Sequence, residues 1–222
     1  VGGQKNTAYG DFSTVVAGCC NTITASSNCG TIVGGAGNRV TQPRGYVGGG
    51  CCNCVCGCEG VVVGGSFNRS LGNSGFSGAG ICNQNDCDYS VIVGGQGNCA
   101  AECNAFIGGG QSNCSTTKWT TVVGGCNNIA TGSGCFNTIG GGKSNCILCS
   151  STASTIAGGQ QNEICTDRST IAGGCGNSLS ATDSFIAGNS NTICAGHNCS
   201  AVVTSGITSV SSEMLHAAKL YL

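Results

Sequence analysis

The sequence predicts an all-β protein, a parallel β-roll or solenoid of about 13 coils with about 15 residues each. Two patterns predict it: a glycine and an asparagine recur together along the chain, and short apolar segments recur between them. A third observation argues against a conventional globular core, because only 5% of the 222 residues are aromatic. We expect residues 1–206 to form the β-roll, and residues 207–222 to form a C-terminal neck or a linker to a further segment.

The repeat is marked by an asparagine that returns after 14 to 17 residues, most often after 15. A glycine stands three residues before each marker asparagine. Glycine adopts positive φ at low cost, and asparagine tolerates it better than most residues. Each Gly-Gly-x-x-Asn motif is therefore predicted to form a tight turn between two short strands. The turn residues are Gly3 and Asn6, Gly18 and Asn21, Gly35 and Asn38, Gly50 and Asn53, Gly65 and Asn68, Gly80 and Asn83, Gly95 and Asn98, Gly110 and Asn113, Gly125 and Asn128, Gly142 and Asn145, Gly159 and Asn162, Gly174 and Asn177, and Gly188 and Asn191.

A period near 15 residues is too short for a strand–helix–strand unit, and no helical spacing of apolar residues is present. One period is therefore predicted to form one turn of a two-walled β-roll, whose turns stack as parallel strands about 4.8 Å apart. Side chains six residues before the marker are predicted to line its interior: Val15, Ile32, Val47, Val62, Ser77, Ile92, Ile107, Val122, Ile139, Ile156, Ile171 and Phe185. Apolar side chains two residues after the marker are predicted to face them: Ile23, Val40, Val55, Ala130, Ile147, Ile164, Leu179 and Ile193.

The first strand of each period is apolar on its other face as well. Five residues before the marker stand Val16, Val33, Val63, Val93, Val123, Ala157, Ala172 and Ile186, and glycine fills this position in four other periods. In three of those periods an aromatic residue precedes the glycine by two residues: Tyr46 before Gly48, Phe76 before Gly78 and Phe106 before Gly108. A strand that is apolar on both faces is buried on both faces. The sequence therefore predicts that copies of the chain pack together around an axis.

Segment 154–179, STIAGGQQNEICTDRSTIAGGCGNSL, resembles the YadA-like head repeats of trimeric autotransporter adhesins. It resembles even more closely the Gly-Gly-x-x-Asn variants in tail-fibre and surface-fibre proteins of phages and large DNA viruses. The resemblance covers about residues 1–206. It implies a left-handed parallel β-roll that forms a homotrimer and has an adhesive or structural role. The left-handed sense rests on the resemblance alone, because the general crossover rule favours a right-handed connection.

The last residues break the repeat. Val210, Met214, Ala217 and Tyr221 are spaced by 4, 3 and 4 residues, which is typical of a coiled-coil neck. The segment is too short to exclude a strand. It resembles the linker that follows such rolls in phage-like fibres, so we expect further fibre or capsid segments to be partners of this chain.

Composition and residue types argue against several other functions. The formal net charge is −1 and only 8% of residues are charged, so the broad basic patch of a nucleic-acid-binding protein is missing. No apolar run reaches the ~18 residues of a membrane span. A catalytic Ser-His-Asp set cannot be built from two histidines in distant coils. The nine acidic residues, spread over 13 coils, do not provide the paired carboxylates of a glycan depolymerase. We therefore predict no catalytic residue and no cofactor.

The cysteine count of 21 is high and odd, which indicates an environment that permits disulfides. Typical adhesin heads contain few or no cysteines, so this count favours a virion component that is oxidised after assembly. Residues one period apart stack about 4.8 Å apart, within the Cα separation that a disulfide accepts. The candidate pairs are Cys99 with Cys114, Cys87 with Cys103, and Cys149 with Cys165. Reduced thiols that pack as small residues are the rival interpretation.

Two clusters contain the residue types of metal ligands. The first is Cys51, Cys52, Cys54, Cys56 and Cys58, which suits soft metals. Cross-linking between coils or chains is the preferred interpretation, because the other cysteines are scattered over coil turns.

The second cluster places Asp86 and Asp88 with Asn83 and Asn85, which offer oxygen ligands for calcium at alternate positions. A bidentate glutamate is missing at the required offset, so a polar turn is preferred. His197 and His216 are far apart in the repeat and are expected on the surface. No metal site is therefore predicted.

The expected function is that of a structural and adhesive segment of a trimeric surface fibre, at the virion surface or otherwise extracellular. Its partners would be copies of itself and an unknown receptor or glycan on the host surface. The head of a bacterial trimeric autotransporter adhesin is one alternative. An ice-binding solenoid is another, because a partial threonine ladder stands seven residues before the marker: Thr14, Thr31, Thr121, Thr138, Thr155 and Thr170.

Overall fold

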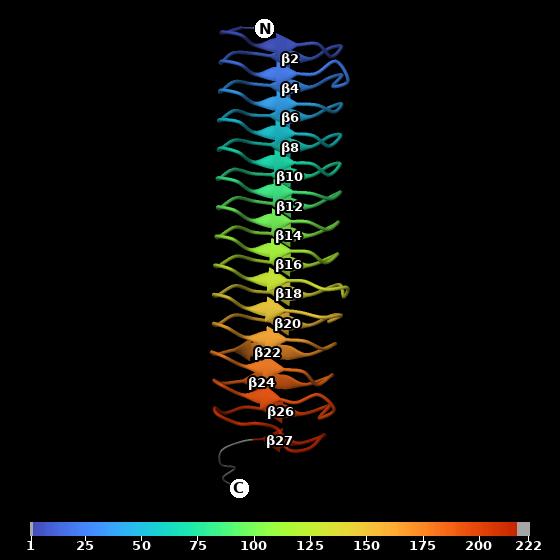
Figure 1. The fold of residues 1–222 in the computed structure, drawn as a ribbon, viewed down its shortest axis with the longest axis vertical. Helices are drawn as coiled ribbons and strands as arrows, with labels where there is room; N and C mark the ends of the chain where they lie inside the picture. Colours follow the sequence, from blue (N-terminus) through green and yellow to red (C-terminus); the bar gives the residue numbers. More distant parts are fainter. Residues whose placement is uncertain (1, 217–222) are drawn as a thin grey trace. The chain divides into compact units, whose positions relative to one another are not determined.

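The computed structural model describes residues 2–216 and shows an all-β parallel solenoid of about 13 turns, each of about 15 residues. The described residues contain no helix. The chain divides into two compact units, Val1–Ser112 and Asn113–Leu222. Within each unit the turns stack in sequence order, and each turn adds one short strand to each of two sheets (Figure 1).

In the first unit, the strands that precede the glycine–asparagine turns form one sheet, which we call the first wall. They are β2 (Thr14–Val15), β4 (Thr31–Ile32), β6 (Tyr46–Val47), β8 (Val61–Val62), β10 (Phe76–Ser77), β12 (Val91–Ile92) and β14 (Phe106–Ile107). The strands that follow these turns form the second wall. They are β1 (Thr7–Ala8), β3 (Thr22–Ile23), β5 (Arg39–Val40), β7 (Cys54–Val55), β9 (Arg69–Ser70), β11 (Gln84–Asn85) and β13 (Cys99–Ala100).

The second unit repeats this arrangement. Its first wall contains β16 (Thr121–Val122), β18 (Thr138–Ile139), β20 (Thr155–Ile156), β22 (Thr170–Gly173), β24 (Phe185–Ala187), β26 (Ala201–Val202) and β27 (Leu215–His216). Its second wall contains β15 (Cys114–Ser115), β17 (Ile129–Ala130), β19 (Cys146–Ile147), β21 (Glu163–Ile164), β23 (Ser178–Leu179) and β25 (Thr192–Ile193). Neighbouring strands are parallel and pair residues one period apart, as Thr155 pairs with Thr138 and Thr170.

The core lies between the two walls. All eight apolar side chains predicted two residues after the marker are fully buried, and so are those predicted six residues before it, with one exception. The exception is Phe185, which is 37% exposed, while the adjacent Ile186 is fully buried. The last marker step is one residue shorter than the usual period, so counting back from Asn191 assigns the wrong face. The pairing of Ile186 with Ile171 keeps isoleucine inside the roll.

The glycine–asparagine turns have a more specific geometry than the sequence indicates. All 13 marker glycines have positive φ, as predicted. The asparagines do not; the second positive φ of each turn belongs to the residue just before the marker, for example Cys52 (φ 57°) and Phe67 (φ 58°). The expectation that asparagine supplies backbone tolerance in these turns is therefore wrong.

The marker asparagine instead forms a buried hydrogen-bond ladder. In Asn53, the backbone N–H donates to Oδ1 of Asn38 at 3.0 Å. Its side-chain amide donates to the carbonyls of Gly49 and Gly65, both at 2.9 Å. The same pattern recurs in the second unit, where Asn145 N–H donates to Oδ1 of Asn128 at 3.0 Å. Asparagine is suited to this position because one short side chain both donates and accepts.

The C-terminal end of the described chain continues the first wall past residue 206. β27 pairs in parallel with β26, with Leu215 opposite Ala201. Met214 lies directly before β27, in a segment without helix. Ala217 and Tyr221, the other half of the predicted neck, lie outside the described residues, so the neck itself stays a prediction.

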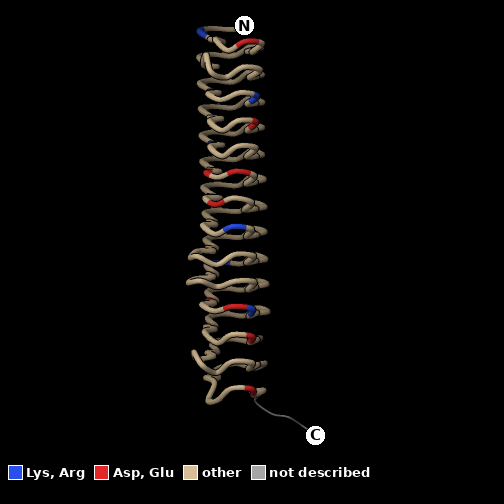
Figure 2. The backbone as a smooth tube through the Cα atoms, turned by 90° about the vertical axis from the view of Figure 1, so that its right-hand side faces the viewer, with Lys and Arg blue, Asp and Glu red and all other residues tan. Residues whose placement is uncertain are grey.

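Charged residues are thinly scattered along both units (Figure 2). Two side-chain ion pairs occur among the described residues, Arg44–Glu59 and Arg168–Asp183. In residues 2–216 we find no helix of the length and hydropathy needed to span a bilayer.

Candidate interaction surfaces

The outer face of the first wall carries no charge, is rich in apolar side chains and is uncovered in the single chain. Its outward side chains include Val16, Val33, Val63 and Val93 in the first unit, and Val123, Ala157, Ala172 and Val203 in the second, all of them exposed. No charged residue occupies the outward positions of the first-wall strands from β2 to β24, where the other outward column holds threonine, valine or an aromatic residue. Isolated exposed apolar side chains are ordinary, but one at almost every turn of a wall indicates a contact surface.

One predicted aromatic–glycine pair is visible on this face. A Cβ atom added at Gly48 would lie 3.5 Å from Cε1 of Tyr46, so the ring of Tyr46 lies over the glycine. Backbone atoms lie closer still, since this Cβ atom would be 2.3 Å from the carbonyl oxygen of Val63, and at Gly78 the three nearest atoms all belong to the backbone of Val93. Glycine is thus required here by close backbone packing as well as by an aromatic neighbour.

The turn opposite the marker asparagines presents one exposed side chain after another. In each period a residue nine positions before the marker has positive φ although it is not glycine; in the coil ending at Asn191 the offset is eight. We call these residues the turn ridge: Phe12, Cys29, Arg44, Glu59, Ser74, Tyr89 and Asn104 in the first unit, and Trp119, Phe136, Ala153, Arg168 and Asp183 in the second. Cys199 and Glu213 follow the last marker and are included because they have positive φ and the same backbone hydrogen bond to the preceding turn.

Hydrogen bonds between turns hold the ridge backbone. The N–H of Glu59 donates to the carbonyl of Pro43 at 3.0 Å, and the N–H of Ser74 donates to that of Cys58 at 2.8 Å. The same bond joins Arg168 to Thr152 at 2.9 Å in the second unit. The side chains contribute nothing to this ladder, so their identity is free to differ from turn to turn.

Ridge side chains contact their ridge neighbours. Trp119 and Phe136 stack with ring centroids 5.2 Å apart, and both rings are about half exposed. Arg44 pairs with Glu59 at 2.6 Å. Arg168 pairs with Asp183 at 2.7 Å, and this guanidinium lowers the pKa of the Asp183 carboxyl. Sequence reasoning missed the ridge because its residue types do not repeat, so nothing in the sequence marks this position.

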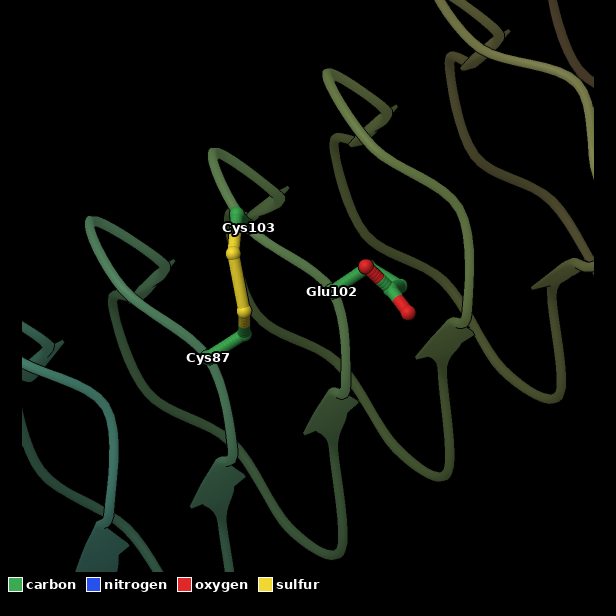
Figure 3. Close-up of side chains that lie close together, drawn as sticks. All are labelled: Cys87, Glu102 and Cys103. Atoms are coloured by element: carbon green, nitrogen blue, oxygen red, sulfur yellow. A yellow bond between two sulfur atoms is a disulfide. The ribbon is translucent and has the colours of Figure 1, made fainter.

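Two of the three predicted disulfide pairs are present in the structure. Cys87 is bonded to Cys103 with a Cα separation of 4.8 Å, as Figure 3 shows, and Cys149 is bonded to Cys165 with a Cα separation of 5.3 Å. Each bond joins adjacent turns. Cys99 begins β13 in the first unit and Cys114 begins β15 in the second. Their pairing stays a prediction.

The dense cysteine cluster is arranged differently from either sequence interpretation. Cys54 is bonded to Cys56, two residues away in the same turn. The sulfur atoms of Cys51 and Cys52 lie 3.2 Å apart, and those of Cys19 and Cys20 do the same. The bond within one turn takes two sulfur ligands from a soft-metal site, and it cross-links neither coils nor chains.

The candidate calcium ligands do not converge. Asn83 and Asn85 are fully buried inside the roll. The Asp86 carboxylate accepts hydrogen bonds from the side chain of Gln84, and that of Asp88 accepts one from the backbone of Asn73.

The two histidines belong to different segments of the second unit. His197 lies within hydrogen-bond distance of Ser209, at 2.7 Å, and His216 belongs to β27. The half-buried His197 is therefore held by a neighbour rather than fully solvated.

No protein family matches this chain, and no curated protein is significantly similar to it in sequence.

Proposed function

We propose that this chain is a structural and adhesive segment of a homotrimeric surface fibre, carried on a phage or large DNA virus particle. The observation that supports this proposal most is the outer face of the first wall. It carries no charge on the first-wall strands from β2 to β24, an apolar residue or glycine recurs on it in every turn beside a partial threonine ladder, and it is exposed in the single chain. A surface of this kind is stable in water when it is covered.

The covering partner is a parallel copy of the same chain. The apolar positions recur once per turn, so a partner matches them along the wall if it has the same period. An identical chain satisfies this condition, and symmetric association of copies is the commonest form of oligomer. Three chains and a left-handed coil are the arrangement that the resemblance to YadA-like heads implies.

The turn ridge is the surface on which a host receptor or glycan would bind. Its backbone is regular, whereas its side chains differ from turn to turn and include exposed aromatic rings and ion pairs. Binding residues are commonly carried on turns that a rigid scaffold positions. The cysteines fit oxidation after assembly at the virion surface; a bacterial trimeric adhesin is the alternative carrier.

The mass of the folded chain in solution tests this function. We expect sedimentation equilibrium to give three chain masses at micromolar concentration, both with and without reductant, because the apolar face requires no disulfide. A stable monomer that stays soluble would contradict the fibre proposal.

Ice binding is the second candidate function. Thr121, Thr138, Thr155 and Thr170 lie in register on four consecutive strands of the second unit. Aromatic and valine side chains occupy this position in β6 to β14 of the first unit, which limits a flat threonine array to part of the wall. A thermal hysteresis assay on the folded protein decides this candidate.

A further inference from the structure

We propose that Cys87, Glu102 and Cys103 form a redox-gated site for a thiophilic divalent cation of the zinc class. The site is closed while the two cysteines are joined and opens when they are reduced. This inference does not depend on the proposed function.

Geometry supports the inference first. One ligand atom from each of the three side chains, two sulfur atoms and a carboxylate oxygen, lies within 4.8 Å of the other two. Figure 3 shows the three side chains on adjacent turns, with the Glu102 side chain extending from its backbone away from the disulfide, so that its carboxylate has to turn toward the sulfur atoms to share a cation with them. All three are half-buried, so solvent reaches them. No other such trio of histidine, cysteine or acidic side chains occurs within residues 2–216.

The donor set fits zinc. Zinc takes thiolate and carboxylate ligands in tetrahedral geometry, and a site with three protein ligands leaves one position for water or another ligand. Disulfide sulfur atoms have no negative charge to offer, so the bonded form lacks the two strongest donors. A dithiol reductant transfers two electrons and two protons to the bond and is itself oxidised to a disulfide. The cation then displaces the two thiol protons.

The surrounding backbone keeps the two cysteines together after reduction. On one side of the pair, the N–H of Asp86 donates to the carbonyl of Ala100 at 2.9 Å. On the other side, the N–H of Asn104 donates to the carbonyl of Asp88 at 3.1 Å. The Cα atoms are therefore held near their present 4.8 Å separation by bonds that reduction leaves intact.

Local charge favours a cation. Asp86 and Asp88 flank Cys87 in the sequence, and Glu102 precedes Cys103. Residues 70–112 contain no lysine, arginine or histidine. An excess of negative charge raises the local concentration of cations, and it adds to the attraction of the thiolates.

The chain contains a matched control. Cys149 and Cys165 also form a disulfide between adjacent turns, with the same sequence separation of 16 residues as Cys87 and Cys103. The residue before Cys165 is Ile164, which is fully buried and offers no ligand. This pair supplies two thiols without a third donor.

The test is zinc protection of individual thiols. The full chain is reduced with a phosphine under argon, treated with or without zinc chloride, alkylated briefly with N-ethylmaleimide and mapped by mass spectrometry. We expect zinc to slow alkylation of Cys87 and Cys103 at least about tenfold, and to protect Cys149 and Cys165 much less. Glu102→Gln, which keeps the disulfide and is expected to fold, should lose most of this protection.

Two results would overturn the proposal. One is equal zinc protection of both cysteine pairs, which would indicate general thiol binding. The other is unchanged protection of Cys87 and Cys103 in Glu102→Gln, which would remove the carboxylate from the site.

Discussion

At the residue scale, Gly95 and Gly97 share one turn and both have positive φ, yet their surroundings differ. A Cβ atom added at Gly95 would lie 2.1 Å from the carbonyl oxygen of Gly110, whereas one added at Gly97 meets nothing closer than 3.8 Å. Other turns carry cysteine, phenylalanine or serine at the position of Gly97. The first glycine is therefore required by close backbone packing, and the second is optional.

We predict that Gly95→Ala lowers the free energy of unfolding by roughly 2–4 kcal/mol, since φ strain and a backbone clash add together. Gly97→Ala should cost about 1 kcal/mol, because only the φ preference is lost. Melting temperatures measured at one protein concentration check both. Similar losses for the two variants would mean that the turn has been assigned wrongly.

Cys146 is a thiol that its surroundings keep protonated. Burial, and secondarily the carboxylate of Glu163 on the paired strand, raises the pKa of this thiol to about 11. Because the thiolate is the reactive form, we predict that iodoacetamide alkylates Cys146 at about pH 8 roughly a hundredfold more slowly than an ordinary cysteine.

The rate at Cys146 should rise about tenfold per pH unit up to about pH 10, as the thiolate fraction rises. Glu163→Gln should accelerate the reaction modestly, because the larger cause, burial, remains. Site-resolved mass spectrometry measures both effects. A rate that levels off below about pH 9 would contradict the raised pKa.

At the scale of elements, β10 and β11 place polar side chains in the interior, as β9 and β15 do with Ser70 and Ser115. Ser77 and Asn85 occupy inward positions and are fully buried. The Oγ atom of Ser77 and the Oδ1 atom of Asn85 have no hydrogen-bond partner among the described residues. The neighbours of Ser77 in register are Val62 and Ile92. A buried polar atom without a partner destabilises the fold.

We therefore predict that Ser77→Val raises the free energy of unfolding by about 1–3 kcal/mol. Ser70→Val is the control, because the Oγ atom of Ser70 donates to the carbonyl of Gly75 at 3.0 Å and that bond would be lost. Thermal unfolding at fixed concentration should show a higher melting temperature for the first variant alone. A fall in stability for Ser77→Val would show that the hydroxyl is satisfied in solution.

The elements also show where sequence reasoning succeeds. The period, the marker glycines and the two inward columns follow from steric rules and hydrophobic patterning, and they are confirmed apart from Phe185. The turn ridge was out of reach because Trp119, Glu59 and Phe136 have low local preference for positive φ. Hydrogen bonds from adjacent turns impose that conformation, and a contact between turns leaves no local signal.

Phe185 shows a second limit. The marker asparagine fixes the phase of the repeat only while the loop between strand and marker keeps its length. One missing residue moves the side-chain alternation by one position, and a one-residue shift exchanges the two faces of a strand. Burial of Ile186 then decides which residue lies inside. The disulfide between Cys54 and Cys56 was missed for a related reason, since a bond within one turn does not depend on the period.

At the scale of the whole molecule, the question is whether the outer face of the first wall is covered. In each unit, successive turns place a valine, alanine or glycine on this face. None of the first-wall strands from β2 to β24 places a charged residue on it. The second wall has arginine, glutamine, glutamate and cysteine at its outward positions, as well as Ile129. Association through the first wall alone leaves the second wall and the turn ridge in contact with solvent.

We predict that Val93→Asp dissociates the proposed homotrimer. Val93 is about half exposed in the single chain, so the substitution leaves the fold of one chain intact. In a trimer with parallel chains, three aspartates would lie at one level near the axis, buried and of like charge, and each such charge is strongly destabilising.

Ile129→Asp is the matched control, because Ile129 is a partly exposed apolar residue on the outer face of the second wall. Sedimentation equilibrium should give one chain mass for Val93→Asp and three for Ile129→Asp, with circular dichroism spectra like that of the unmodified chain. If Val93→Asp stays trimeric, the chains associate through another surface, and the apolar first wall then has no explanation in oligomerisation.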